Sequence, residues 1–334
     1  MTRYVIIGAG AVGASLAAQF QSVGIDYALV GRGEQIRHIR SHGLTFQRPS
    51  GTQTVRLNAY DTQEPPALTT DDVLILAVKA QDVETATAFW SRQTLKDSPE
   101  TAGFRLPLVT LQNGLAAEAV ASRRFAHVYG ASILTPARFT EVGTVVAGGS
   151  PQVGAVVLGV YPSGENETAR KIGADLAQAN YLTEVRSDVR RWKAAKLVYN
   201  VKNVLEIFSG EADAVSVFAD RLSQEATSVL KAAAYDIADA SERRVSLAGW
   251  GAAPDSGIKP GQQSTWQSFV RGVPNEVDYL NGEIVQLGRI HNVETPYNSA
   301  VQEAAARLAL AGGQPGSITL DDIEVIIDRV ARAA

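Results

Sequence analysis

Residues 3 to 13 are Arg-Tyr-Val-Ile-Ile-Gly-Ala-Gly-Ala-Val-Gly, and this stretch decides the fold. The apolar run Arg3 to Ile7 predicts a buried strand, and glycines follow it at once. From Ala11 to Val23 the apolar side chains recur at helical spacing, and Gly24 is placed to end a helix. The stretch therefore predicts a strand, a tight glycine turn and a helix in direct succession.

The three glycines of this turn have the spacing of a phosphate-binding loop. Gly8 allows the tight turn, Gly10 lets a pyrophosphate approach the backbone, and Gly13 permits close packing of the helix on the sheet. The free amides and the positive end of the helix dipole complete an anion site. A glycine turn without a ligand is the alternative, and the agreement of strand, loop and helix argues against it. We expect a bound dinucleotide.

The end of the next expected strand, residues 27–30, indicates which dinucleotide. An NAD enzyme carries Asp or Glu there for the ribose hydroxyls, whereas this chain has Gly31-Arg32. Arg32 can stack on adenine and pair with a 2'-phosphate, which a carboxylate would repel. The alternative is an ordinary surface arginine. Arg32 favours NADP(H) as the cofactor.

Outward from this stretch, the first half of the chain alternates short apolar runs with amphipathic segments, as in a parallel sheet covered by helices. Further strands are expected at 73–78, 107–111, 128–133, 144–147 and 155–160, and a hairpin from 44–46 and 55–57. Beyond about Ser187 the apolar period is helical, with helices expected at 188–208, 222–245, 276–291, 296–310 and 320–330 and no convincing strand. The Gly/Pro-rich stretch 249–263 is expected to be an active-site or hinge loop.

The fold class that follows is α/β, with an N-terminal Rossmann-type doubly wound sheet and an all-α C-terminal domain. We place the NADP-binding domain at residues 1–186 and a helical domain for substrate binding and dimerisation at 187–334. A cleft between the two is expected to receive a small substrate. The length of 334 residues agrees with two domains, since single cores usually stop growing at roughly 250 to 300 residues.

Composition excludes several other functions. A net charge of -4 provides no basic excess for a nucleic-acid partner, and no apolar run has the roughly 20 residues that cross a membrane. The absence of cysteine rules out disulfides and thiolate chemistry, and agrees with a cytoplasmic location. Of the four histidines only His38 and His42 have i, i+4 spacing, and neighbouring arginines oppose a cation there, so no metal is expected.

Two polar residues end otherwise apolar strands, where ligands of open α/β sheets gather. Lys79 follows residues 73–78, and Asn113 follows residues 107–112. The lysine could face cofactor phosphate or ribose, and the asparagine could hold the nicotinamide ribose or the substrate. A solvated lysine and a simple Asn-Gly turn are equally open alternatives.

The segment Arg191 to Asn203 has the most informative polar pattern in the helical half. Lys196, Asn200 and Asn203 follow one another at i, i+4 and i+7, on one helical face, and Lys193 extends that face. Desolvation lowers the pKa of a partly buried lysine, which can then protonate a carbonyl oxygen as a hydride arrives. From these residues alone a solvated polar face is the more frequent case.

Two later segments are explained as helix starts from the residues alone. Ser264-Thr265-Trp266-Gln267 and Asn275-Glu276-Val277-Asp278 each place a capping residue three positions before a polar one. Only together with the lysine segment and the glycine loop do they indicate a functional site.

Taken in order, these pieces resemble the ketopantoate reductase (2-dehydropantoate 2-reductase) family over nearly the whole chain. The motifs that carry the resemblance are Gly8 to Gly13, Ala77-Val78-Lys79, Leu111-Gln112-Asn113-Gly114, Trp192 to Asn200, Ser264 to Gln267 and Asn275 to Glu283. The resemblance implies NADPH-dependent reduction of a 2-oxo acid to a 2-hydroxy acid. In this family the reaction converts 2-dehydropantoate to D-pantoate in pantothenate biosynthesis.

The resemblance also implies roles for individual residues. The cofactor contacts would be Gly8, Ala9, Gly10, Ala11, Val12, Gly13, Arg32, Lys79, Asn113, Ala137 and Glu276. The substrate contacts would be Asn113, Lys196, Asn200, Asn203 and Ser264, with Lys196 as the proton donor.

The chain departs from the family pattern in the expected substrate pocket. Typical members have a second asparagine eight residues after the lysine, where this chain has Val204, with Asn203 beside it. No counterpart exists for a further asparagine expected near residues 210–214. Two alternatives to ketopantoate reduction therefore stay open, a related 2-hydroxy acid dehydrogenase for another branched or aromatic 2-oxo acid, and a non-catalytic NADP-sensing protein. A homodimer is a further possible partner arrangement.

Overall fold

The computed structural model describes residues 2–333 of the chain, which form two units. The first comprises residues 2–112, 117–190 and 243–258, and the second comprises 113–116, 191–242 and 259–333. Four residues after Gln112, 113–116, thus belong to the second unit, although its helices begin only at Arg191.

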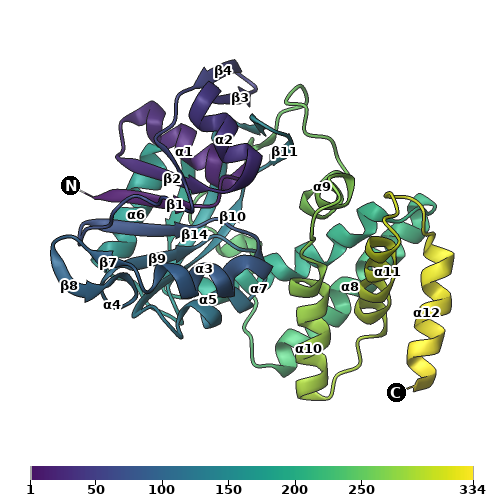
Figure 1. The fold of residues 1–334 in the computed structure, drawn as a ribbon. Coiled ribbons are helices and arrows are strands. Elements are labelled where there is room, and N and C mark those ends of the chain that lie inside the picture. The colour runs from purple at the N-terminus through teal and green to yellow at the C-terminus, as the bar shows by residue number, and fades with distance from the viewer. Residues whose placement is uncertain (1, 334) are drawn as a thin grey trace. The chain divides into compact units, whose positions relative to one another are not determined.

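The first unit is built on an eight-stranded sheet (Figure 1). Its order is β15-β14-β10-β9-β6-β1-β2-β5. The strands are β1 (Arg3–Ile7), β2 (Tyr27–Gly31), β5 (Ala59–Asp61), β6 (Asp72–Leu76), β9 (Pro107–Thr110), β10 (His127–Leu134), β14 (Gly154–Val160) and β15 (Tyr181–Val185). From β5 to β10 all neighbours are parallel, in the Rossmann order, which confirms the expected fold class.

The sheet is mixed rather than purely parallel, which corrects the sequence-based expectation. Strand β14 runs antiparallel to β10, and β15 then pairs parallel with β14. The reason lies in the connection, because β10 reaches β14 through short strands and turns. This connection runs through β11, β12 and β13 and contains no helix, whereas parallel neighbours are usually joined through one.

Helices cover both faces of this sheet, and β1 shows how. Tyr4 and Ile6 face a core that contains Leu16 of α1, whereas Val5 and Ile7 face a second core that contains Trp90 of α3. The helical segments of this unit are α1 (Ala11–Val23), α2 (Gly33–His42), η1 (Ala80–Asp82), α3 (Val83–Trp90), α4 (Ala102–Arg105), α5 (Ala116–Ala121) and α6 (Glu167–Gln178).

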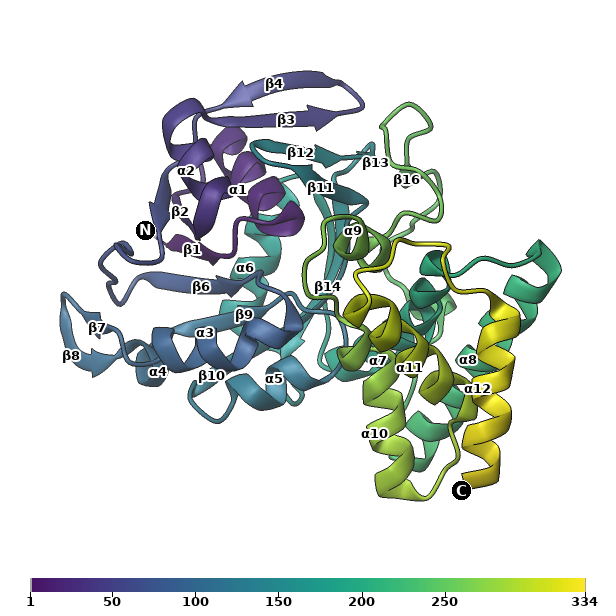
Figure 2. The ribbon, with the colours of Figure 1, turned by 45° about the vertical axis from the view of Figure 1, so that its right-hand side comes forward.

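Smaller sheets lie beside the main one. The expected hairpin is confirmed as β3 (Leu44–Arg48) and β4 (Gly51–Val55), which join β11 (Ala137–Glu141) and β12 (Thr144–Ala147) in a four-stranded sheet (Figure 2). Strands β7 (Thr94–Leu95) and β8 (Ser98–Thr101) form a short pair. Strand β13 (Gly149–Ser150) pairs with β16 (Gly251–Ala252), a short strand that the sequence did not indicate.

The second unit is helical, as expected, with one core. Its segments are α7 (Val189–Asn200), η2 (Val201–Ile207), α8 (Ala212–Ala232), η3 (Ala240–Glu242), α9 (Ser264–Val270), η4 (Val277–Tyr279), α10 (Asn281–His291), α11 (Pro296–Leu310) and α12 (Leu320–Ala333). The helix expected at 222–245 is wrong at both ends, since α8 begins earlier and ends at Ala232, before Ala234 at φ 58°. Within residues 2–333, no helix has the length and hydropathy needed to cross a membrane.

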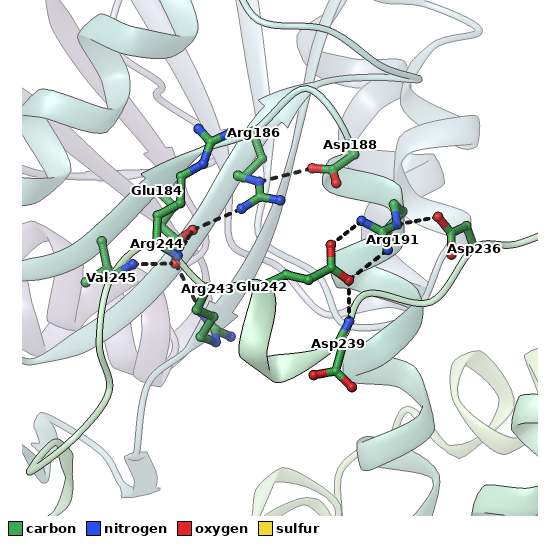
Figure 3. A network of polar contacts seen from close by, with 10 residues as sticks. All are labelled: Glu184, Arg186, Asp188, Arg191, Asp236, Asp239, Glu242, Arg243, Arg244 and Val245. Atoms are coloured by element: carbon green, nitrogen blue, oxygen red, sulfur yellow. Dashed lines mark hydrogen bonds and ion pairs between the residues drawn. The ribbon is translucent and has the colours of Figure 1, made fainter.

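The irregular segment after α8 is held by two carboxylates, each within its own unit (Figure 3). In the first unit, Glu184 of β15 accepts hydrogen bonds from the amides of Arg244 at 3.0 Å and Val245 at 3.2 Å. In the second unit, Glu242 pairs with Arg191 of α7 at 2.7 Å. The segment is therefore fastened before and after residue 243 and is not a free loop.

Candidate functional site

The glycine turn of the first unit has the shape that a phosphate ligand requires. A Cβ on Gly8, at φ 119°, would lie 2.7 Å from the carbonyl carbon of Ala77, and a Cβ on Gly13 would lie 1.9 Å from the Gly8 carbonyl oxygen. A Cβ on Gly10 would meet nothing within 4 Å. The first and third glycines are thus required by protein packing, whereas the second leaves open space over the start of α1. These residues fit a dinucleotide pyrophosphate.

The end of β6 lies directly against this turn. Gln112 donates its side-chain amide to the carbonyl oxygens of Leu76 at 2.8 Å and Val78 at 2.9 Å. Both bonds fix the backbone that approaches Gly8 and that leads to half-buried Lys79. In the sequence Gln112 stands only within the motif Leu111 to Gly114, and a glutamine at the end of an apolar run is the signal for this role.

Arg32 stands where the sequence placed it, after β2 and immediately before α2. Its side chain is 73% exposed, and its Nη2 lies 3.1 Å from the Asp82 carboxylate at the end of η1. The guanidinium is therefore available to a ligand and is already oriented by a weak surface ion pair. No local pattern in the sequence indicates this contact with Asp82.

Ala137 is the first residue of β11 and pairs with Ala147. Strand β11 packs against α1, the helix that the glycine turn opens. The position of Ala137 within the first unit is thus compatible with the cofactor role that the family implies.

In the second unit, the polar face of α7 is largely buried rather than solvated. Lys193 is 4% exposed, Asn200 is 4% and Asn203 is 5%, and Lys196 is half-buried. Lysine is seldom buried in proteins without a functional or pairing reason. The more frequent reading of this face from sequence alone, as a surface stripe, is wrong.

Lys196 has the electrostatic setting of a general acid. Desolvation and the neighbouring ammonium of Lys193 lower the pKa of Lys196 to about 7, against the opposing effect of the Glu276 carboxylate. An acid with a pKa near neutrality can give up its proton and regain it at the pH of the cell. The structure brings these three residues together within one unit.

A change of helix type decides which asparagines share a face. Helix α7 ends at Asn200, and the chain continues as the 3-10 segment η2 from Val201 to Ile207. Residues three apart eclipse one another in a 3-10 helix, so Asn203 follows Asn200 on the same face. Val204 is 1% exposed and belongs to the helical core. Asn203 therefore has the position that continues the polar face.

Ser264 is the first residue of α9, but its side chain does not cap the helix. The N-cap residue is Gln263, whose backbone N–H donates a hydrogen bond to the Glu206 carboxylate at 2.7 Å. Burial raises the pKa of Glu206. The interpretation of Ser264 as an N-cap was thus wrong, and its hydroxyl is not consumed by the helix start. Glu206 was missed, although a single acid within Val204 to Phe208 is unusual in an apolar run.

The long motif from Asn275 to Glu283 positions other parts of the second unit. Asn275 Oδ1 accepts a hydrogen bond from the Val277 amide at 3.0 Å, as a turn residue does. Glu276 is 8% exposed beside the lysines, and Glu283 accepts a hydrogen bond from the Leu115 amide at 2.8 Å. The Asn113 turn and the lysine helix therefore belong to the same unit.

A buried polar chain supports the junction of α7 and η2, which the sequence did not indicate. Asn281 donates to the carbonyl oxygen of Val201 at 2.9 Å and to Asn298 Oδ1 at 3.0 Å. Asn298 in turn donates to Glu225 at 2.7 Å. Asn281 and Asn298 are fully buried, so these bonds fix the backbone between Asn200 and Asn203.

A doubly wound sheet with a glycine turn that fits a pyrophosphate, joined in one chain to a helical unit with a half-buried lysine of lowered pKa, is typical of a dinucleotide-dependent oxidoreductase. Two family models match the chain, "Ketopantoate reductase PanE/ApbA" over residues 4–162 and "Ketopantoate reductase PanE/ApbA C terminal" over residues 188–309. The chain belongs to the ketopantoate reductase family.

Individual relatives agree with this assignment. A protein of Pyrococcus horikoshii named 2-dehydropantoate 2-reductase is 25% identical over 92% of this chain and 98% of its own length. The fold is similar to a ketopantoate reductase of Ralstonia eutropha (22% identity, TM-score 0.74, covering 93% of this chain and 99% of that one). It is also similar to D-mandelate dehydrogenase solved with NADH and anilino(oxo)acetate (18% identity, TM-score 0.76, the same coverage).

Proposed function

We propose that this protein uses NADPH to reduce a 2-oxo acid to a 2-hydroxy acid, with 2-dehydropantoate as the favoured substrate and D-pantoate as the product. The observation that supports this most strongly is Lys196, which lies on a buried polar face and has a pKa lowered to about 7. Family membership supports the reaction class, and the exposed Arg32 supports the choice of NADPH.

When bound, the nicotinamide supplies a hydride to the carbonyl carbon of the substrate. Lys196 donates a hydrogen bond to the carbonyl oxygen and transfers its proton there as the hydroxyl forms. Lys193 favours the neutral lysine that remains, and Glu276 favours its return to the charged form. The two residues together hold the acid near the pH at which it works.

The neighbouring polar groups orient the substrate in this proposal. Asn200 and Asn203 present amides on one face of the α7 and η2 junction, and Ser264 offers a hydroxyl at the start of α9. Such groups fix the carboxylate and carbonyl of the substrate relative to Lys196, and orientation alone lowers a barrier substantially.

A panel of 2-oxo acids with NADPH oxidation followed optically tests the proposal. We expect turnover of 2-dehydropantoate with a higher kcat/KM than for any other member of the panel. Tight NADPH binding without turnover of any 2-oxo acid would instead identify a non-catalytic NADP-sensing protein. Rescue of a pantothenate-requiring strain is an independent test of the substrate.

A second enzymatic function is favoured by one observation, the apolar side chain at Val204. A pocket with one asparagine moved to position 203 has a different arrangement of donors from the typical family pocket. The fold neighbour D-mandelate dehydrogenase makes an aromatic 2-oxo acid the most informative competitor. A higher kcat/KM for such an acid than for 2-dehydropantoate would establish a related 2-hydroxy acid dehydrogenase.

We also propose a homodimer. Large apolar side chains are exposed on the helical unit, among them Val217, Ile290, Leu310 and Val325. A fold neighbour from Staphylococcus aureus is described as a dimeric ketopantoate reductase, which supports the same arrangement here. Sedimentation equilibrium should give about twice the chain mass of 35.5 kDa.

A further inference from the structure

The turn formed by Asn113, Gly114 and Leu115 is held by the helical unit, although it directly follows a strand of the main sheet. Leu115 is 8% exposed and packs in the helical core with Ala194 and Leu197 of α7. Gln112, one residue before the turn, is bonded instead to the end of β6. The backbone of the turn is therefore set by contacts that come from the second unit.

Those contacts come from η4 and the first turn of α10. The carboxylate of Glu283 accepts a hydrogen bond from the Leu115 amide at 2.8 Å. Gly114 has φ 78°, and a Cβ there would lie 2.4 Å from the Tyr279 carbonyl oxygen and 2.9 Å from Glu283 Oε2. The turn is thus pressed against η4 so closely that only glycine fits, and Glu283 fixes its far side.

The side chain of Asn113 has a polar atom without a hydrogen-bond partner among the described residues. This atom, Oδ1, is buried. Buried amide oxygens are rarely left without a donor in proteins, and exceptions gather at functional sites. A ribose hydroxyl or a carboxamide of a bound nicotinamide cofactor could supply the missing donor.

We infer that Glu283 is a positioning residue, which holds the Asn113 turn in the conformation that presents the Asn113 carboxamide to the cofactor. The inference rests on the proposed function only in taking Asn113 as a ligand contact. Without an acceptor for the Leu115 amide, the peptide after Gly114 can rotate, and the carboxamide two residues before it loses its fixed direction. If Glu283 only stabilised the start of α10, its replacement would lower the stability of the protein without acting through Asn113.

A double-mutant cycle on dinucleotide affinity tests this. The dissociation constant for NADPH is measured by calorimetric titration for the wild type, Glu283→Ala, Asn113→Ala and the double variant. We expect each single change to weaken binding about 5-fold to 20-fold, as for the loss of one buried hydrogen bond. The double variant should bind no more weakly than Asn113→Ala, because the carboxylate acts through that side chain.

Two further variants separate positioning from general stability. Glu283→Gln keeps an acceptor of the same length and should restore affinity to within about twofold of wild type, and it remains informative if the alanine variant fails to fold. Asp278→Asn is the matched control, since this carboxylate lies in the same motif but accepts from Gln302 at 2.7 Å on α11. Its effect should add to that of Asn113→Ala.

The outcomes are distinct for the inference and for the proposed function. Additive effects of Glu283→Ala and Asn113→Ala, or unchanged affinity in Glu283→Ala, would overturn the inference even in an active enzyme. A non-additive cycle in a protein that turns over no 2-oxo acid would support the inference and reject the proposed reaction. Failure of the wild type to bind NADPH or NADH would reject both.

Discussion

The carbonyl oxygen of Gly8 lies 1.9 Å from the point where a Cβ on Gly13 would stand, whereas no atom lies within 4 Å of the corresponding point on Gly10. The two glycines therefore make opposite predictions. Gly13→Ala should destabilise the first unit by about 2 kcal/mol or more, because α1 must move away from the turn. Gly10→Ala should leave stability unchanged and weaken dinucleotide binding about tenfold or more, since the methyl group occupies the approach of the pyrophosphate.

Thermal unfolding and calorimetric titration of NADPH on the same two variants check this pair. A Gly10→Ala protein that binds NADPH as tightly as wild type would show that the open space above the turn is not the phosphate site.

The glycine turn was the part of the fold that could best be predicted from the sequence, because a strand, three spaced glycines and a helix each follow local rules. The antiparallel direction of β14 could not be predicted, since it depends on how the chain returns after β10. The end of α8 at Ala232 was missed for a related reason. The apolar period continues to residue 245, but residues 243–245 bond to Glu184 of β15 instead of forming a helical turn.

Site residues could be predicted where the residue type itself indicates the chemistry. They could not be predicted where their role depends on a contact with a residue far away in the sequence. Lys196 and Arg32 were identified from their positions, but burial of the lysine face depends on tertiary packing. Asp82, Glu206 and Glu283 lie 50, 57 and 168 residues from their partners Arg32, Gln263 and Leu115. No local pattern links such pairs.

Lys196→Ala should lower kcat about 100-fold to 10,000-fold while leaving the dissociation constant for NADPH nearly unchanged, because the lysine acts on the substrate oxygen. Steady-state kinetics with 2-dehydropantoate and a separate NADPH titration provide the two readouts. Lys202→Ala is the control, since that ammonium lies 5.0 Å from the ring centre of exposed Tyr199 and has no role in the proposed reaction. Full turnover in Lys196→Ala would contradict the mechanism.

The pH dependence of reduction should follow the protonation of Lys196. A general acid works in its protonated form, which is present below its pKa, so kcat/KM should fall as the pH rises through about 7. Lys193→Met removes a charge that lowers this pKa and should move the fall to higher pH. Glu276→Gln removes a charge that raises it and should move the fall to lower pH, each by about half a unit to one unit. Identical profiles in wild type and both variants would assign the titration to another group.

The choice between NADPH and NADH should depend on Arg32. Arg32→Ala should raise KM for NADPH about 10-fold to 100-fold and leave KM for NADH nearly unchanged, since a charge-assisted pair with the 2'-phosphate is lost. Asp82→Asn should act in the opposite direction, because it frees the guanidinium and removes a negative charge 3.1 Å from it. Arg37→Ala, at an exposed position of α2, is the control. Equal effects of Arg32→Ala on both cofactors would remove the support for NADPH.

Glu184 should be a large contributor to the stability of the first unit. Its side chain is 3% exposed, accepts two backbone amides and lies 3.6 Å from Arg186 and 3.8 Å from Arg243. Glu184→Ala removes a buried acceptor that these partly buried donors share and should cost about 3 to 5 kcal/mol, measured by urea unfolding. Glu165→Ala breaks a surface pair with Arg170 at 3.8 Å and should cost less than about 1 kcal/mol. Amide exchange at Arg244 and Val245 should quicken only in the first variant, because Glu184 is the acceptor that protects both amides. Equal unfolding midpoints for the two variants would mean that residues 243–245 are held by other contacts.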